Sequence, residues 1–169
     1  MFDIGSKRTG VVRFGFGGSF NLGGGYFHIN GKCLIHGKFS CGRGIQFLVG
    51  AKANAEFGNN FEANANCIIN TGNKELFVGD DVIFGWGTTI LAANGHEIIS
   101  ESEGAETDNN IYIGNYVWLC SDVKCLFGTK INDDSDVAAN VIVTKGFCES
   151  NILIGGNNKI LKREINWKK

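Results

Sequence analysis

The sequence of 169 residues predicts one all-β domain in which short parallel strands wind into a stacked coil. Apolar residues recur every six positions over most of the chain, which matches neither the period of about 3.6 residues of a helix nor the period of 2 of a strand. A fixed period indicates a repeat architecture. The 25 glycines, with no proline, suit the many tight turns of such a coil.

Residues 1–26 are rich in glycine and alternate apolar with small residues, which predicts irregular early coils. Residues 27–91 form the first regular run. If each flat face of a coil takes about six residues, three faces complete one turn, and successive turns lie about 4.8 Å apart. We expect small or medium inward side chains, because a triangular core is narrow. The inward positions are Phe27, Cys33, Phe39, Ile45, Ala51, Phe57, Ala63, Ile69, Val78, Phe84 and Ile90.

Residues 111–145 carry the most regular repeat, with a second inward register two residues away from the first. The main register is Ile113, Leu119, Cys125, Ile131, Val137 and Val143. In the tail, residues 146–169, apolar side chains are expected to cover the open end of the coil, because an exposed sheet edge must be capped. These side chains are Ile160, Leu161, Ile165 and Trp167.

Residues 92–110 interrupt the period and contain the sequence Asn94-Gly95-His96-Glu97. A polar loop that leaves a rigid repeat is a common place for function. Imidazole has an ordinary pKa of about 6.5 and is mostly neutral at neutral pH, so it can accept a proton there. The segment is therefore predicted to be a catalytic loop.

Charge and hydropathy exclude several classes of protein. Sixteen Lys and Arg against 17 Asp and Glu give a net charge of −1, which offers no overall footprint for nucleic acid. No run of about 18 apolar residues predicts a membrane span. The first residues lack the apolar stretch of a signal peptide, so a cytoplasmic location is expected.

Six cysteines occur without any C-x-x-C pair, so neither a zinc ribbon nor a redox pair is indicated. Cys33, Cys41 and Cys125 fall on inward positions and are interpreted as small buried hydrophobic residues of a reducing compartment. A cysteine nucleophile stays open in principle, although no basic residue stands beside one in the sequence.

Three segments resemble the hexapeptide-repeat acetyltransferases: Ile113–Leu119, Val141–Lys145 and Ile154–Lys162. The chain is similar to the branch of galactoside and maltose acetyltransferases and bacterial polysaccharide O-acetyltransferases, over roughly residues 55–167. The resemblance implies a left-handed parallel β-helix, although parallel crossovers are otherwise right-handed. It also implies a homotrimer that binds acetyl-CoA in a cleft between subunits.

The resemblance assigns His96 as the general base that takes the proton from an acceptor hydroxyl. Asn64 matches a family residue near the reacting groups, and a turn-stabilising role is an equal alternative. Glu62 stands where family members often carry an aromatic residue, which leaves the acceptor subsite undefined.

The resemblance also implies a coenzyme A site. Trp118 matches a residue that flanks the pantetheine arm, and Lys159 and Lys162 match basic positions near the nucleotide phosphates, for which lysine supplies a point charge. Ordinary packing and solvated tail lysines are the alternatives. Asn158 replaces the usual proline of this segment. The remaining coenzyme A positions are Ser121, Ala139, Thr144 and Lys145.

We therefore predict an acetyl-CoA-dependent O-acetyltransferase that acts on a hydroxyl of a sugar or surface-polysaccharide precursor and requires no metal. N-acetylation of an amino sugar is the nearest alternative. A γ-type carbonic anhydrase would need three zinc-binding histidines, yet the chain has only three in all, and the closest two, His28 and His36, are eight residues apart. A non-catalytic scaffold is the remaining alternative.

Overall fold

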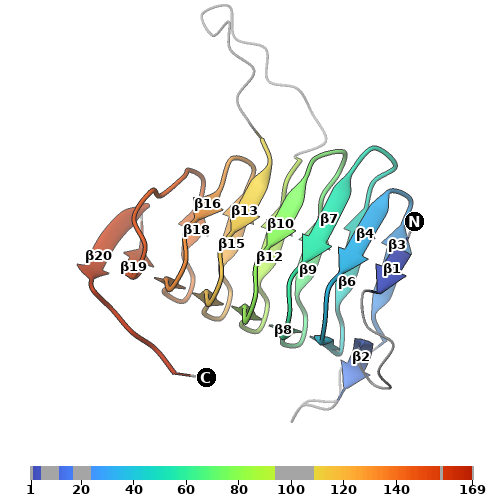
Figure 1. Cartoon of the computed structure of the whole chain (residues 1–169), viewed down its shortest axis with the longest axis horizontal. Helices are drawn as coiled ribbons and strands as arrows, with labels where there is room; N and C mark the ends of the chain where they lie inside the picture. Colours follow the sequence, from blue (N-terminus) through green and yellow to red (C-terminus); the bar gives the residue numbers. More distant parts are fainter. Residues whose placement is uncertain (1, 5–11, 17–23, 94–108, 157, 169) are drawn as a thin grey trace, which may run out of the picture.

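The computed structural model describes residues 2–4, 12–16, 24–93, 109–156 and 158–168. Every regular element in these ranges is a β-strand, and the strands form three sheets that wrap around one long core (Figure 1). No helix long and apolar enough to cross a membrane occurs in these ranges.

The chain passes through the three sheets in turn. Sheet A holds β1 (Phe2–Ile4), β4 (Lys32–Ile35), β7 (Asn54–Phe57), β10 (Leu76–Val78), β13 (Ile111–Ile113) and β16 (Lys130–Ile131). Sheet B holds β2 (Val12–Phe16), β5 (Phe39–Gly42), β8 (Phe61–Ala63), β11 (Ile83–Phe84), β14 (Trp118–Leu119), β17 (Asp136–Val137), β19 (Ile152–Gly155) and β20 (Lys159–Arg163). Sheet C holds β3 (Tyr26–Ile29), β6 (Gln46–Val49), β9 (Ile68–Asn70), β12 (Thr89–Leu91), β15 (Lys124–Leu126) and β18 (Ile142–Val143).

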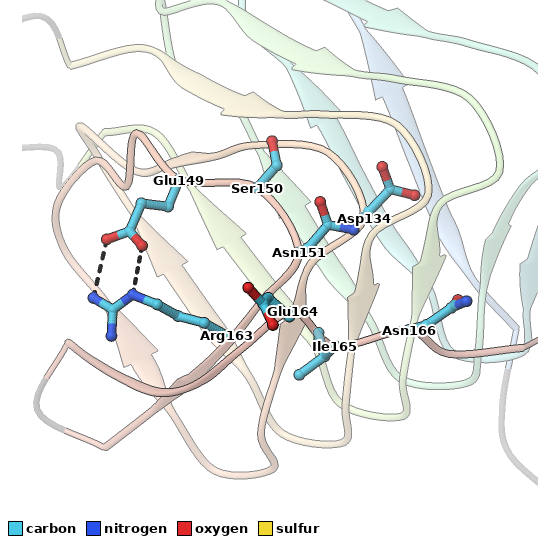
Figure 2. A pocket seen from close by; sticks show the side chains of 8 residues that line it. All are labelled: Asp134, Glu149, Ser150, Asn151, Arg163, Glu164, Ile165 and Asn166. Atoms are coloured by element: carbon cyan, nitrogen blue, oxygen red, sulfur yellow. Dashed lines mark hydrogen bonds and ion pairs between the residues drawn. The ribbon is translucent and has the colours of Figure 1, made fainter.

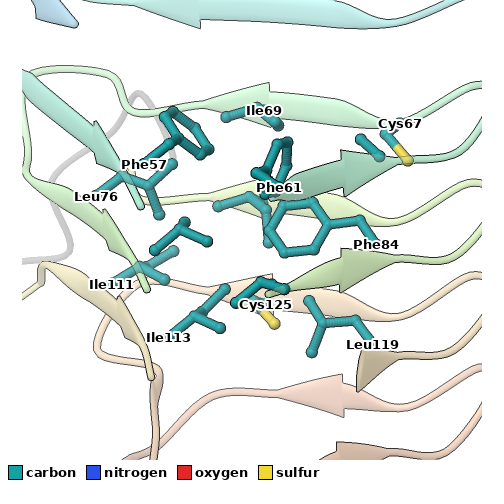
Figure 3. Close-up of a cluster of buried hydrophobic side chains, with 14 of the residues drawn as sticks. Phe57, Phe61, Cys67, Ile69, Leu76, Phe84, Ile111, Ile113, Leu119 and Cys125 are labelled. Atoms are coloured by element: carbon teal, nitrogen blue, oxygen red, sulfur yellow. The ribbon is translucent and has the colours of Figure 1, made fainter. Parts of the chain in front are cut away.

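The strand pairs are parallel, except for the antiparallel pair of β19 and β20. In the strands from β4 to β19 the inward residues are buried and most of the outward ones are not, which confirms the predicted stacked parallel coil (Figure 3). Every residue of the main register from Ile113 to Val143 is buried.

The coils differ in length on the two sides of the interruption. Cys33 pairs with Ala55, 22 residues later, whereas Ile113 pairs with Ile131, 18 residues later. The strict six-residue period therefore holds after the interruption only. In the earlier coils some faces carry three inward residues instead of two, as at Ala53, Ala55 and Phe57.

Two predicted inward positions are wrong. Ala51 is exposed, because a turn closed by the hydrogen bond from Ala53 N to Gly50 O places it outside the coil. Phe27 is 39% exposed, because β3 is the end strand of sheet C in the part of the chain that the structure describes.

The expectation of small or medium inward side chains holds only in part in the earlier coils, where Ala55 and Ala63 are buried beside large rings. The greater length of these coils makes room for phenylalanines whose ring centroids lie about 5 Å apart, with Phe39 contacting Phe61 at 4.9 Å and Phe61 contacting Phe84 at 4.9 Å. Such aromatic contacts stabilise the core beyond the apolar area that they bury. Fully buried phenylalanines are Phe39, Phe47, Phe57, Phe61 and Phe84.

Left-handed backbone conformations recur at the corners of the coils, where the chain turns from one sheet into the next. Asn and Asp tolerate positive φ better than other residues with side chains, which explains their frequency between strands. At the A–B corner these residues are Asn60, Asp81, Tyr116, Asp134 and Asn151. At the B–C corner they are Gly44, Asn66, Gly87, Asp122 and Asn140.

The tail caps the coil only in part. Ile160 packs against the core, but Leu161 is 56% exposed. After β20 the chain runs back along the A–B corner, where Ile165 N donates to Asn151 O at 3.1 Å and Trp167 stacks on Tyr116. Trp167 therefore covers the side of the coil, contrary to the prediction that it covers the open end.

Candidate active site at the B–C corner

The B–C corner brings several predicted site residues into one line. Backbone hydrogen bonds join successive coils there: Gly87 N donates to Ala65 O at 3.0 Å, Asp122 N to Trp86 O at 2.7 Å, and Asn140 N to Ser121 O at 3.0 Å. The middle residues of successive corners are Arg43, Ala65, Trp86, Ser121 and Ala139. Ser121 and Ala139 are thus neighbours on one corner.

Asn64 lies at the same corner, at the end of β8. Its backbone N and its side-chain Nδ2 both donate to Phe84 O, at 2.8 and 3.1 Å. The half-buried side chain is therefore held against the next coil. Its Oδ1 accepts no hydrogen bond from a described residue, so it can accept one from a ligand.

Trp118 stands on the outer face of sheet B, where β14 pairs with Ile83 on one side and Asp136 on the other. Its side chain is 38% exposed. The Trp167 ring lies beside it, with centroids 5.9 Å apart. Trp118 is three residues before Ser121 and thus lies on the same coil, between the tail and the B–C corner.

Thr144 is fixed by the residue that replaces the usual proline. Thr144 N donates to Asn158 Oδ1 at 3.0 Å, and Asn158 Nδ2 donates to Thr144 Oγ1 at 2.8 Å. Asn158 has a φ of 54°, which proline cannot adopt because its ring locks φ near −65°. The departure therefore builds a specific turn between β19 and β20.

Three lysines lie near the C-terminal end of the coil. Lys145 places its Nζ 5.3 Å from the centroid of the Phe147 ring. Lys159 and Lys162 are exposed on β20, opposite Gly155 and Leu153 of β19. They provide positive charge without forming a closed pocket.

No protein-family model matches the chain, but individual relatives do. The galactoside O-acetyltransferase of Lactococcus lactis is 33% identical over 115 residues, which are 67% of this chain and 54% of that protein. The chain belongs to the hexapeptide-repeat acetyltransferases. It spans about half the length of this curated relative.

Solved structures of acetyltransferases share the fold. The polySia-specific acetyltransferase NeuO has a TM-score of 0.61 and 20% identity, over 99% of this chain and 89% of that one. A Vibrio cholerae acetyltransferase complexed with acetyl-CoA has a TM-score of 0.52 and 22% identity, over 82% of this chain and 71% of that one. The predicted left-handed parallel β-helix is confirmed.

The predicted base, His96, lies outside the described residues, as does the rest of 94–108. The two ends of that segment are described: Ala93 follows β12 and Asn109 precedes β13, both at the C–A corner. Asn110 Oδ1 accepts a hydrogen bond from Glu75 N at 2.9 Å, which ties the second end to the preceding coil.

The other two histidines contact side chains of this chain, one on sheet C and the other next to sheet A. His28, on sheet C, contacts Tyr26 Oη through Nδ1 at 2.7 Å and Asn30 Oδ1 through Nε2 at 2.8 Å. His36, next to sheet A, contacts Glu56 Oε1 at 2.6 Å. No group of three possible metal-binding side chains occurs among the described residues.

Sequence reasoning missed Asp136, which lies beside Trp118 on sheet B. Burial raises its pKa to about 6, and its Oδ1 is buried without a hydrogen-bond partner in the described part of the chain. Burial, and secondarily the charge of Asp136, also raise the pKa of Cys120. The signal available in the sequence was the position of Asp136, an acidic residue at an outward position with apolar strands on both sides.

The interpretation of the inward cysteines as packing residues is confirmed. All six thiols are free, and Cys67 is buried as well. Burial raises the pKa of Cys33, Cys67 and Cys125 to about 12 and raises that of Cys41. These four thiols are therefore protonated at neutral pH and poor nucleophiles.

A hollow of about 710 Å³ lies elsewhere, between the tail and the A–B corner (Figure 2). Arg163 spans its wall and donates to both carboxylate oxygens of Glu149, at 2.6 and 3.2 Å. None of the predicted site residues lines this hollow. The candidate active site is thus placed at the B–C corner and not at this hollow.

Proposed function

We propose that the protein transfers an acetyl group from acetyl-CoA to a hydroxyl of a sugar or surface-polysaccharide precursor. The order of residues along the B–C corner carries the proposal. Asn64 lies at one end and Ala139 three coils further, a span of about 14 Å at a strand spacing of about 4.8 Å. This line suits a long ligand with a reactive group at one end.

The far end of the line suits the charged part of coenzyme A. Lys145, Lys159 and Lys162 can face its phosphates, and the paired Thr144 and Asn158 offer polar groups held in place. Trp118 offers an aromatic surface to the pantetheine arm. The acetyl-CoA complex of the Vibrio cholerae acetyltransferase supports the choice of donor.

The chemistry needs a base at the reactive end. His96 takes the proton of the acceptor hydroxyl as the oxygen attacks the thioester carbonyl. The carbon–sulfur bond then breaks, and the coenzyme A thiolate leaves and takes the proton from His96. Asn64, fixed by Phe84 O, orients the acceptor or the thioester and helps to hold the two reactants together.

The names of the relatives support a sugar acceptor, since they include galactoside O-acetyltransferases and a polySia-specific acetyltransferase. The cytoplasm remains the proposed location.

A homotrimer is proposed as the active assembly, with sites between subunits. The outer face of sheet C supports self-association, because several of its side chains are aliphatic and a second copy can cover them. The side chain of Ile142, for example, is 48% exposed. The aliphatic residues of this face are Leu48, Ile68, Leu91, Leu126 and Ile142.

An acceptor screen tests the function. Purified protein is incubated with acetyl-CoA and a panel of sugars, and the products are identified by mass while free thiol is measured. A product heavier by one acetyl group, with one thiol released per product, is expected. If neither product nor thiol forms with any sugar, and acetyl-CoA does not raise the melting temperature, the enzyme proposal is wrong.

A further inference from the structure

Trp86 is the most exposed tryptophan in the described part of the chain, at 57%. It occupies the middle of the B–C corner, one coil after Ala65 and one coil before Ser121. Its indole forms no hydrogen bond or ring contact with another described residue. An aromatic ring of this size, presented to solvent on the corner that carries the candidate site, is suited to contact a ligand.

The backbone beneath Trp86 is rigid. Gly85 N donates to Leu119 O at 2.7 Å, and Trp86 O accepts from Asp122 N at 2.7 Å. A Cβ on Gly85 would lie 2.5 Å from the carbonyl carbon of Cys120, so only glycine allows the coils this approach. Gly87 has a φ of 69°, a conformation that glycine adopts without strain. The indole is therefore attached to a fixed support.

The neighbours of Trp86 along the corner are small. Ala65 precedes it and Ser121 follows it, so no large side chain stands beside the indole in the line of corner residues. Asn64, whose amide is held by Phe84 O, comes from the preceding coil. Asn64 precedes Ala65, the residue in register with Trp86, so its amide lies on the coil next to the indole.

We infer that Trp86 is the stacking platform for the sugar ring of the acceptor, an inference that rests on the proposed function. The apolar C–H face of a sugar packs well on an indole, while its hydroxyls point toward polar groups. Trp86 is one coil from Asn64, the end of the line where the acceptor hydroxyl is proposed to meet the thioester. Ser121 and Ala139 lie on the other side of Trp86. An acceptor ring bound at the Asn64 end lies close to the indole.

Kinetics of Trp86→Ala and Trp86→Phe test this role. With the acceptor found in the screen, Trp86→Ala is expected to raise the acceptor KM about tenfold, the equivalent of one strong aromatic contact. The acetyl-CoA KM stays within about twofold, and Trp86→Phe retains most of the affinity. Trp118→Ala is the matched control, because it is expected to raise the acetyl-CoA KM and to leave the acceptor KM nearly unchanged.

An unchanged acceptor KM in Trp86→Ala would overturn the inference, as would an equal rise in both KM values. Circular dichroism checks that the variant folds, which is expected because the side chain is exposed. Titration of a galactoside, maltose and oligosialic acid, read by tryptophan fluorescence, needs no turnover. A response that Trp86→Phe abolishes supports the platform even if no acetyl transfer occurs, whereas an identical response in both proteins contradicts it.

Discussion

Tyr116 and Trp167 hold each other by two reciprocal hydrogen bonds across 51 residues of sequence. Trp167 Nε1 donates to Tyr116 O at 3.1 Å, and Tyr116 Oη donates to Trp167 O at 3.1 Å. The rings stack with centroids 4.4 Å apart. Tyr116 has a φ of 53°, which costs an ordinary residue about 1–2 kcal/mol. The contact therefore fastens the tail at a strained corner.

Trp167→Ala is expected to destabilise the protein by about 2–3 kcal/mol. The side chain is only 8% exposed, but water can enter the vacated site, so the loss is smaller than for an interior tryptophan. The melting temperature should fall by several degrees. Trp118 also loses its neighbour, so the acetyl-CoA KM should rise. The melting temperature of Trp167→Phe, which keeps the ring stack without the Nε1 donor, should lie between those of the wild type and Trp167→Ala. An unaltered melting temperature in the alanine variant would refute the contact.

Tyr116→Asn is expected to change the sign of its effect with the genetic background. In the wild type it removes the stacked ring and destabilises the fold. In Trp167→Ala only the relief of the positive φ remains, so the same substitution should stabilise by about 0.5–1 kcal/mol. A double-mutant cycle by denaturant unfolding measures this, and additive effects would show that the two residues are not coupled.

Asp136 is expected to make stability depend on pH between about 4 and 6. Its pKa is raised to about 6 in the folded chain, so the folded state holds a proton that the unfolded state has released. Stability therefore falls as pH rises through this window. Because the side chain is only partly buried, the effect is on the order of 1 kcal/mol. Asp136→Asn should remove the slope in unfolding experiments; an equal slope in the variant would contradict the assignment.

Asn158→Pro is expected to disrupt the β19–β20 turn, because proline cannot reach the φ of 54° and offers no side-chain hydrogen bond to Thr144. Asn158→Gly is the matched control, since it allows the backbone but also lacks the side chain. The proline variant should lose about 1–3 kcal/mol more stability than the glycine variant. Both variants lack the side chain that holds Thr144, so both should show a smaller thermal shift with coenzyme A. Equal stability of the two variants would exclude a role for the positive φ of Asn158.

The coil itself was predictable because inward positions repeat along the sequence. From Ile113 to Val143 every predicted residue is buried, since two inward residues per face leave no freedom of register. The earlier coils are wider, and the period alone does not reveal a third inward residue on a face. Ala51 was misplaced for this reason, and the size of the phenylalanine core was underestimated.

The site was only partly predictable. Asn64, Ser121 and Ala139 lie along one corner because the repeat dictates it. Trp167 reaches Tyr116 through contacts between distant segments, which no local pattern encodes. Trp86 and Asp136 occupy outward positions, where the repeat places no constraint on residue type. Their significance follows from exposure and burial, which only the folded chain defines.

The most direct test of catalysis by His96 is the acetylation rate of His96→Ala, measured against the wild type with acetyl-CoA and the best acceptor. The rate is expected to fall by about 10²- to 10⁴-fold, the contribution of a general base, while the thermal shift with acetyl-CoA is unchanged. A variant that acetylates the acceptor as fast as the wild type would contradict the proposed mechanism.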